Sequence, residues 1–241
     1  MSGPTLTARI GDGHSDMFDL VIFDCDGVLI DSEIISAQML VQELAGLGVQ
    51  IDLAYVALHF LGRSYPTVMD QIRREFGLNL PPEFEEQYRQ RLLAAFERDL
   101  KIMPHVQSVL SRMAVPWCVA TSSSPKRVEQ SLRLVGLDKM VGERLFTSTM
   151  VARGKPAPDL FLHTAHSMGA EPGRCLVIED SLNGIRAARA AGMTCWRFTG
   201  GSHLADAPPE PEDAQPDRRF ASFDGFFDLA PGLAFAERAG A

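Results

Sequence analysis

The sequence has few cysteines and no two of them close enough for a zinc or redox motif. Cys25, Cys118, Cys175 and Cys195 are widely separated, and three of them lie in apolar runs typical of strands, so we expect reduced thiols in or near the core. No apolar stretch is long enough to span a membrane, and residues 2–16 lack the apolar segment of an export signal. We therefore expect a cytoplasmic protein with no membrane partner, in which residues 1–16 form a flexible N-terminus.

Positive charge is in deficit. The 23 Lys and Arg residues face 31 Asp and Glu residues, which gives a formal net charge of -8. This balance argues against nucleic acid or an anionic membrane surface as the main partner. A small anionic substrate is not excluded, because a few local cations and a metal ion dominate the field inside one pocket. With 241 residues, 46% of them hydrophobic, the chain is long enough for a core domain with an insert, and we expect a monomer or weak homodimer.

The order of apolar patterns predicts an α/β fold. The run Leu20 to Phe23 is typical of a buried strand, whereas residues 32–100 show only helical spacing, as in Phe84, Tyr88, Leu92, Phe96 and Leu100. From residue 102, short apolar runs at 116–120, 175–178 and 194–198 alternate with helical patterns, as in βαβ units with a parallel sheet. We expect a doubly wound, Rossmann-like catalytic core of residues 17–31 and 102–241, with an all-helical cap domain, residues 32–101, inserted after the first strand. Residues 205–219 predict an exposed loop before a last short element near 219–227.

Polar side chains follow the ends of these apolar runs. Because the carboxyl ends of parallel strands meet at one edge of the sheet, where such folds keep their active sites, we expect these side chains to lie together. They are, in chain order, Asp24, Asp26, Thr121, Ser122, Lys155, Glu179 and Asp180.

This set of groups favours phosphoryl transfer. A phosphate monoester is dianionic, so it repels an attacking carboxylate unless cations screen the charge. A Mg²⁺ ion held by Asp24, Asp180 and nearby oxygens, together with the ammonium group of Lys155, supplies that screening. Hydroxyl and backbone N–H donors at Thr121 and Ser122 are placed to hold the remaining phosphoryl oxygens.

The two aspartates of the first strand have complementary chemical roles. Asp24 forms an aspartyl-phosphate, and Asp26 protonates the leaving alkoxide and later deprotonates the attacking water. Taken singly, each group also has a structural explanation, since a DxD pair caps turns and Glu179–Asp180 could cap the following helix. Their occurrence at consecutive strand ends favours the catalytic interpretation.

Four motifs carry a family resemblance. FDCDGVLIDSE, VATSSS, RGKPAPDLF and VIEDSLNGIRAARAAGM follow one another in this order between about residues 17 and 200. The set resembles the haloacid dehalogenase superfamily of aspartate-nucleophile hydrolases. Within it, the set is similar to the branch with a small helical cap, which contains sugar-phosphate phosphatases and β-phosphoglucomutase.

The resemblance implies a role for each matching residue. Asp24 corresponds to the nucleophile, Asp26 to the general acid/base, and Thr121 and Lys155 to the phosphate-binding pair. The cap is implied to close over the substrate and to exclude bulk water. The resemblance implies Mg²⁺ as cofactor, with the backbone carbonyl of Asp26 also on the metal; the implied ligands are Asp24, Asp26, Glu179 and Asp180.

Departures from the family's branches narrow the predicted reaction. Mutases of this branch carry a His at the position of Ser36 and a cap lysine, yet residues 32–100 contain no lysine. Haloalkanoate dehalogenases need no metal and generally lack the equivalent of Asp26. We therefore expect a Mg²⁺-dependent phosphatase acting on a small phosphomonoester, a sugar or sugar-acid phosphate. The alternatives are a β-phosphoglucomutase-like phosphotransferase and a non-catalytic binding protein that retains the fold.

Substrate choice is expected to depend on the cap. Glu33 follows the crossing into the cap, and the turn Gly62, Arg63, Ser64 is the other group that we expect to face the leaving group. Related caps carry a Gly-x-Ser turn followed by Arg. Here Tyr65 follows the serine and the arginine precedes it, so the sequence does not identify a particular sugar.

Overall fold

The described part of the chain contains one six-stranded sheet. The computed structural model describes residues 18–80, 83–205 and 209–235, and the expected flexible segment 1–16 lies outside them. All paired strands are parallel and follow the order β3-β2-β1-β4-β5-β6. Their bounds are β1 Leu20–Phe23, β2 Trp117–Thr121, β3 Leu145–Thr147, β4 Cys175–Glu179, β5 Thr194–Phe198 and β6 Arg218–Phe220.

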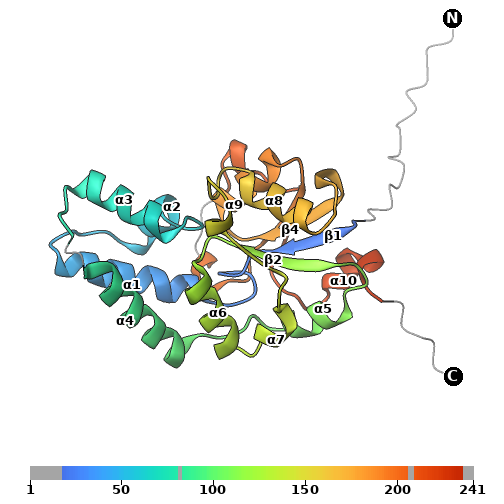
Figure 1. Cartoon of the computed structure of the whole chain (residues 1–241), viewed down its shortest axis with the longest axis horizontal. Helices are drawn as coiled ribbons and strands as arrows, with labels where there is room; N and C mark the ends of the chain where they lie inside the picture. The colour runs from blue at the N-terminus through green and yellow to red at the C-terminus, as the bar shows by residue number, and fades with distance from the viewer. Residues whose placement is uncertain (1–17, 81–82, 206–208, 236–241) are drawn as a thin grey trace, which may run out of the picture.

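Helices cover both faces of the sheet (Figure 1). Alternate side chains of β1 point to opposite faces: Val21 and Phe23 belong to one buried cluster, Leu20 and Ile22 to another. This alternation explains why a continuous apolar run forms the strand, since both of its faces are buried. The cluster of Val21 and Phe23 includes side chains of α5 Val106–Arg112, α6 Pro125–Leu134, α7 Asp138–Val141 and α10 Phe226–Leu229. The other includes side chains of α8 Asp159–Ser167 and α9 Leu182–Ala190.

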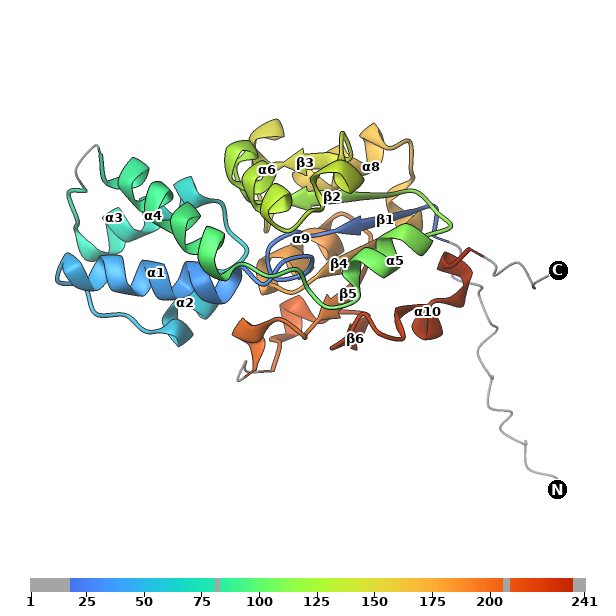
Figure 2. The same cartoon turned by 90° about the horizontal axis from the view of Figure 1, so that it is seen from below.

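Residues 33–99 form a bundle of four helices at one end of the molecule (Figures 1 and 2). We call this segment the helical insert. Its helices are α1 Glu33–Gly46, α2 Leu53–His59, α3 Tyr65–Phe76 and α4 Phe84–Asp99. They share a buried cluster of their own, in which the predicted i, i+4 series of α4 takes part through Phe84, Tyr88, Leu92 and Phe96. None of the helices in the described residues is long and apolar enough to cross a membrane.

The chain enters and leaves the helical insert through two adjacent segments. The N–H of Asp31 donates to the carbonyl of Lys101 at 2.9 Å, and Ile30 and Ile102 form an isolated antiparallel bridge. The exit and return of the chain are therefore hydrogen-bonded to each other beside the end of β1. The division into separate core and cap domains at these residues remains our proposal, supported by the separate hydrophobic cluster of the insert.

The predicted α/β doubly wound fold is confirmed, with two additions. β3 is only three residues long and partly exposed, so it lacks the kind of apolar run by which β1, β2, β4 and β5 were predicted. The expected last element is two elements, β6 and α10. Five single 3-10 turns complete the described elements: η1 Ser148–Met150, η2 Pro172–Arg174, η3 Ser202–Leu204, η4 Glu212–Ala214 and η5 Pro231–Leu233.

Candidate active site

The candidate site begins where β1 ends. The N–H of Asp24 donates to the carbonyl of Ile178 at 2.9 Å, which continues the pairing of β1 with β4 up to the first aspartate. The chain then turns sharply at Gly27, whose φ is +80°. A Cβ at Gly27 would lie 2.2 Å from Asp180 Oδ2. Because glycine has no Cβ, the turn can adopt the left-handed backbone conformation and approach the end of β4 closely.

Lys155 joins the nucleophile candidate to β4. Its ammonium Nζ donates to Asp24 Oδ1 at 2.6 Å, to Glu179 Oε1 at 2.7 Å and to the carbonyl of Ala120 at 3.1 Å. The side chain is 1% exposed. Burial disfavours a charged ammonium, but Asp24 and Glu179 outweigh it and raise the pKa of Lys155. Lys155 is therefore a buried cation that contacts two of the predicted acidic residues.

Glu179 is occupied by protein donors on both oxygens. Oε1 accepts from Lys155, while Oε2 accepts from the N–H groups of Asp180 and Ser181, both at 2.8 Å, and from Ser181 Oγ at 3.0 Å. Burial opposes its ionisation, yet Lys155 and these donors outweigh burial and lower the pKa of Glu179. Its carboxylate therefore holds Lys155 and the chain that follows β4 in place.

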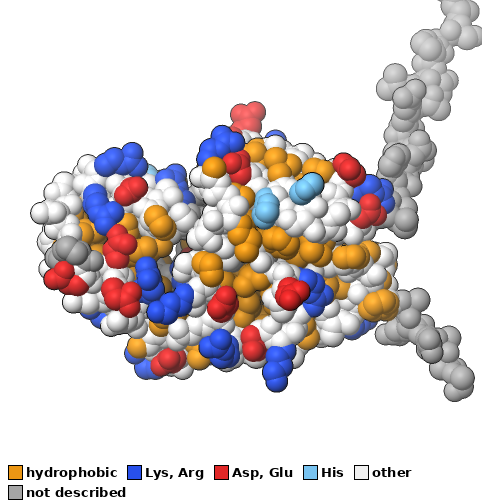
Figure 3. Space-filling model, viewed as in Figure 1, with side chains coloured by type: hydrophobic (Ala, Val, Ile, Leu, Met, Phe, Trp, Pro, Cys, Tyr) orange, Lys and Arg blue, Asp and Glu red, His pale blue; other side chains and the backbone are white. Residues whose placement is uncertain are grey.

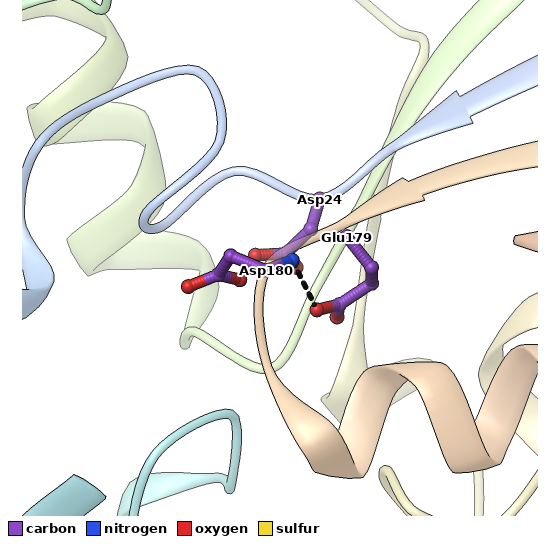
Figure 4. A group of neighbouring side chains, drawn as sticks. All are labelled: Asp24, Glu179 and Asp180. Carbon is purple, nitrogen blue, oxygen red and sulfur yellow. Dashed lines mark hydrogen bonds between the residues drawn. The ribbon is translucent and has the colours of Figure 1, made fainter. Parts of the chain in front are cut away.

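Asp24, Glu179 and Asp180 form a cluster with the geometry of a metal site (Figure 4). One oxygen from each lies within 4.8 Å of the other two, and all three residues are buried. Burial raises the pKa of Asp24 well above its ordinary range despite the opposing charge of Lys155, and burial followed by the charge of Glu179 does the same for Asp180. Two neighbouring buried carboxylates with raised pKa values, those of Asp24 and Asp180, form an environment that a divalent cation stabilises.

The hydrogen bonding of Asp180 shows whether the site fits a metal ion. Its Oδ2 is buried and accepts no hydrogen bond from the described residues. His203 Nε2 lies 2.8 Å from this oxygen, but the imidazole is not aligned as a donor, and both ring nitrogens also lack a partner there. Buried carboxylate oxygens are normally paired, and oxygen ligands are those that Mg²⁺ prefers. The residues present therefore fit a hard divalent cation at Asp24 and Asp180.

Asp26 is held by four donors. Its Oδ1 accepts from Ser32 Oγ at 2.6 Å and from Arg127 Nη2 at 2.9 Å, and its Oδ2 accepts from Ser123 Oγ at 2.6 Å and Thr121 Oγ1 at 3.3 Å. Burial raises its pKa, but Arg127 and the three hydroxyls outweigh burial and leave the pKa of Asp26 below its usual value. These contacts favour the carboxylate form of Asp26.

The hydroxyl of Ser122 makes a contact that the sequence did not predict. Its Oγ donates to the carbonyl of Gly62 at 2.9 Å, and Asn183 Nδ2 donates to the neighbouring carbonyl of Leu61 at 2.8 Å. Two core side chains thus hold the turn between α2 and α3 against the sheet. Phosphate binding by Ser122, which stays a prediction, is thereby left to its backbone N–H, whereas Thr121 Oγ1 lies beside Asp26 as expected.

A cavity of about 130 Å³ opens between the helical insert and the ends of the strands. Glu33, Gly62 and Arg63 line it, as expected for residues that face a leaving group. Ser64 is not among the residues that line it, and its hydroxyl shares a hydrogen bond of 2.8 Å with Thr67. Burial, followed by the charges of Asp26 and Asp180, raises the pKa of Glu33 to about 8, which favours the protonated form of its carboxyl group near neutral pH.

Four residues of the site were missed by sequence reasoning. Ser123 is the fifth residue of the VATSSS motif and directly follows Ser122, so the same motif contained the signal. Ser32, which begins the crossing into the insert, had only its position as a signal. Arg127 and His203 reach Asp26 and Asp180 from sites 101 and 23 residues away along the chain, and no pattern in the sequence connects them.

Comparisons with known proteins show which family this chain resembles. The family model of haloacid dehalogenase-like hydrolases matches residues 18–192. The chain is 28% identical over 186 residues to the 6-phosphogluconate phosphatase of Escherichia coli, covering 77% of this chain and 84% of that one. It is 34% identical over 179 residues to the fructose-1-phosphate phosphatase of the same organism, covering 72% of this chain and 92% of that one. A solved hydrolase of Deinococcus radiodurans with bound phosphate and sodium is 32% identical, with a TM-score of 0.68 over 92% of this chain and 100% of that chain.

Proposed function

The chain belongs to the haloacid dehalogenase-like hydrolases, and from this premise we propose that it is a Mg²⁺-dependent phosphatase that hydrolyses a small sugar or sugar-acid phosphate through an aspartyl-phosphate on Asp24. The phosphatase names of its relatives support the reaction class. The observation that carries the proposal is the contact of buried Lys155 with both Asp24 and Glu179. This contact supports the proposal because a buried cation lies beside the carboxylate to which we assign the attack on phosphorus.

In the first half-reaction, a carboxylate oxygen of Asp24 attacks phosphorus, and the bond from phosphorus to the ester oxygen breaks. Lys155 screens the repulsion between the carboxylate and the dianionic phosphoryl group. The leaving alkoxide takes a proton from Asp26, which for this step carries the proton as a neutral acid. The products are the free alcohol and a phosphate esterified to Asp24.

In the second half-reaction, water attacks the phosphorus of the aspartyl-phosphate, and inorganic phosphate leaves with the regenerated Asp24 carboxylate. Asp26 takes the proton of that water. The four donors on Asp26, which lower its pKa, favour the carboxylate form that this step requires. General acid/base assistance of this kind is typically worth roughly 10²–10⁴-fold.

The proposed metal site uses Asp24, Asp180 and the backbone carbonyl of Asp26. When bound there, Mg²⁺ would supply Lewis-acid stabilisation of the phosphoryl oxygens. The buried, unpartnered Oδ2 of Asp180 supports its role as a ligand. Both carboxylate oxygens of Glu179 already accept hydrogen bonds, from Lys155 and from the chain after β4. This supports a role in positioning Lys155 and Asp180, in place of the direct metal ligation that the sequence predicted.

No observation favours the phosphotransferase alternative. At the position where mutases carry a histidine, Ser36 Oγ donates to the carbonyl of Ser32 at 2.9 Å and accepts from Arg127 Nη2 at 3.2 Å. The non-catalytic alternative does not fit membership of a hydrolase family whose relatives are phosphatases.

The proposal is tested with the purified chain and a panel of sugar and sugar-acid phosphates. Phosphate release is expected with Mg²⁺, none after removal of the metal with EDTA, and recovery when Mg²⁺ is restored. Asp24→Asn is expected to abolish turnover while the Tm stays within a few degrees of the wild type. Asp224→Asn, a change of the same kind at an exposed position, is the control and retains full activity. Turnover by Asp24→Asn would exclude Asp24 as the nucleophile.

A further inference from the structure

Three side chains that line the cavity carry buried polar atoms without a partner. Arg63 Nε, Tyr65 OH and Arg127 Nε accept or donate no hydrogen bond within the described ranges. Buried donors are nearly always satisfied, because an unmade hydrogen bond leaves their desolvation uncompensated. Three side chains around one cavity beside Asp24 and Asp26 thus have hydrogen-bonding capacity that the described residues do not use.

Arg127 occupies a central position among these groups. It extends from α6 of the sheet half of the molecule, and its Nη2 donates to Asp26 Oδ1 at 2.9 Å and to Ser36 Oγ of α1 at 3.2 Å. The guanidinium also lies over the ring of Phe96 in α4, with Cζ 5.3 Å from the ring centroid. One fixed, permanently charged group thus contacts the acid/base carboxylate and two helices of the insert.

The cavity wall beyond Asp24 and Asp26 is cationic. Arg63 Nη1 donates to Gln71, an uncharged partner, at 2.9 Å, and the guanidinium has no ion pair with a described carboxylate. Of the acidic residues on this wall, Glu33 has a pKa of about 8 because of burial and its acidic neighbours, and Glu85 is paired with Arg73. In the space-filling view, basic side chains gather on the insert near its boundary with the rest of the molecule (Figure 3).

We propose that Arg127 is a specificity-determining residue that binds an anionic group, a carboxylate or a second phosphate, on the leaving alcohol, with Arg63 and Tyr65 as further donors. The inference rests on the proposed phosphatase function and narrows its substrate class. A planar guanidinium presents donors in a fork that matches carboxylate and phosphate oxygens. Because the same guanidinium contacts Asp26, an anionic group bound to it holds the leaving oxygen near the acid that protonates it.

The test compares esters that differ only in the charge of the leaving alcohol. Gluconate 6-phosphate and glucitol 6-phosphate share one carbon chain, as do glycerate 3-phosphate and glycerol 3-phosphate, and in each pair only the first compound carries a carboxylate. Glucose 1,6-bisphosphate against glucose 6-phosphate distinguishes a second phosphate from a carboxylate. The readout is the ratio of kcat/KM within each pair, so any effect of the variant on Asp26 that is common to both members cancels.

The wild type is expected to prefer the anionic member of at least one pair by about tenfold to a hundredfold, the range of a charge-assisted hydrogen bond. Arg127→Gln reduces that ratio at least tenfold, mainly through the KM of the anionic ester, and Arg127→Lys restores part of it. Lys126→Gln, which removes an exposed charge from the neighbouring position of α6, leaves the ratio unchanged. Calorimetric binding of the same pairs to Asp24→Asn protein, with and without Arg127→Gln, measures the same selectivity without turnover.

The measured rates distinguish an error in the role of Arg127 from an error in the proposed phosphatase function. Mg²⁺-dependent hydrolysis without preference for any anionic member, or with a preference that survives Arg127→Gln, overturns the role of Arg127 alone. Absence of hydrolysis from every ester overturns the phosphatase proposal and, with it, the inference.

Discussion

Gly62 lies where the turn between α2 and α3 meets the rest of the molecule, so Gly62→Ala perturbs this contact with a single methyl group. Its φ is +73°, and a Cβ there would lie 2.2 Å from Ser181 Oγ and 2.7 Å from Ser181 Cβ. Ser181 cannot turn away freely, because its Oγ accepts from the N–H of Gly184 at 3.1 Å and donates to Glu179 at 3.0 Å. The turn must therefore withdraw from the end of β4.

The size of the effect follows from the contacts that withdrawal removes. The turn is held by hydrogen bonds from Ser122 to the carbonyl of Gly62 and from Asn183 to that of Leu61. Each contributes about 1 kcal/mol net, so losing both disfavours the position in which the turn lies against the strand ends by roughly 2 kcal/mol. We call this position closed, and the withdrawn position open. A difference of that size reduces the closed population about 30-fold relative to the open one. Separately, an L-residue in the left-handed region costs about 1–2 kcal/mol of folding stability.

Gly77→Ala provides a matched control for the backbone term. Gly77 also has a positive φ, +64°, within the helical insert, but a Cβ there meets nothing within 4 Å. Both variants are expected to lose similar thermal stability, while only Gly62→Ala reduces kcat/KM for para-nitrophenyl phosphate by about 30-fold. The assay pairs steady-state kinetics with Tm from calorimetry. Equal kcat/KM values in the two variants would refute the argument that catalysis needs the close contact between Gly62 of the turn and Ser181.

Three further substitutions test the buried charges. Lys155→Met leaves the carboxylates of Asp24 and Glu179 without their cation and is expected to destabilise by about 3–5 kcal/mol in urea unfolding; a loss below 1 kcal/mol would contradict the pairing. Glu33, with a folded pKa of about 8 against 4.5 for the free group, binds a proton in the folded chain but not in the unfolded chain between these pH values. Glu33 therefore makes the free energy of unfolding fall as pH rises through this window. Glu33→Gln, measured without metal, removes this contribution and makes the fall less steep than in the wild type; parallel pH profiles of the two proteins would contradict the raised pKa of Glu33. Gly184→Ala favours α9 by about 1 kcal/mol on helix propensity alone, yet its Cβ would lie 1.7 Å from Glu179 Oε1, so we expect a lower Tm and lost activity, and a raised Tm would contradict this packing.

Four strands of the sheet could be predicted from the sequence because β1, β2, β4 and β5 are buried along almost their whole length. Runs such as 20–23 and 175–178 have no polar residue to place on a solvent side, and such runs are typical of parallel strands. The parallel order then brings their carboxyl ends to one edge, which is why Asp24, Lys155 and Asp180 could be grouped before any coordinates. β3 escaped this reasoning because Leu145 and Phe146 are partly exposed and the strand ends after Thr147.

Side-chain directions in the loops could not be predicted in the same way. Ser122 and Ser123 are chemically identical neighbours, yet the first donates to Gly62 in the insert and the second to Asp26. Strand alternation no longer applies once the chain has left β2, so the backbone of the loop decides which serine faces which partner. Ser64 was likewise expected at the cavity because of its neighbours, but its hydroxyl bonds to Thr67 at the start of α3.

The charge balance of the site links the metal, the nucleophile and Arg127. Four buried carboxylates, those of Asp24, Asp26, Glu179 and Asp180, lie at the strand ends, and among the described residues the permanently charged partners of these carboxylates are Lys155 and Arg127. Lys155 forms ion pairs with Asp24 and Glu179, and Arg127 forms one with Asp26. Asp180 therefore has no ion pair with a permanently charged side chain of the described residues. A dianionic phosphate adds still more negative charge. This charge balance supports our proposal that a divalent cation binds at Asp180 when Asp24 is ionised and the substrate is bound.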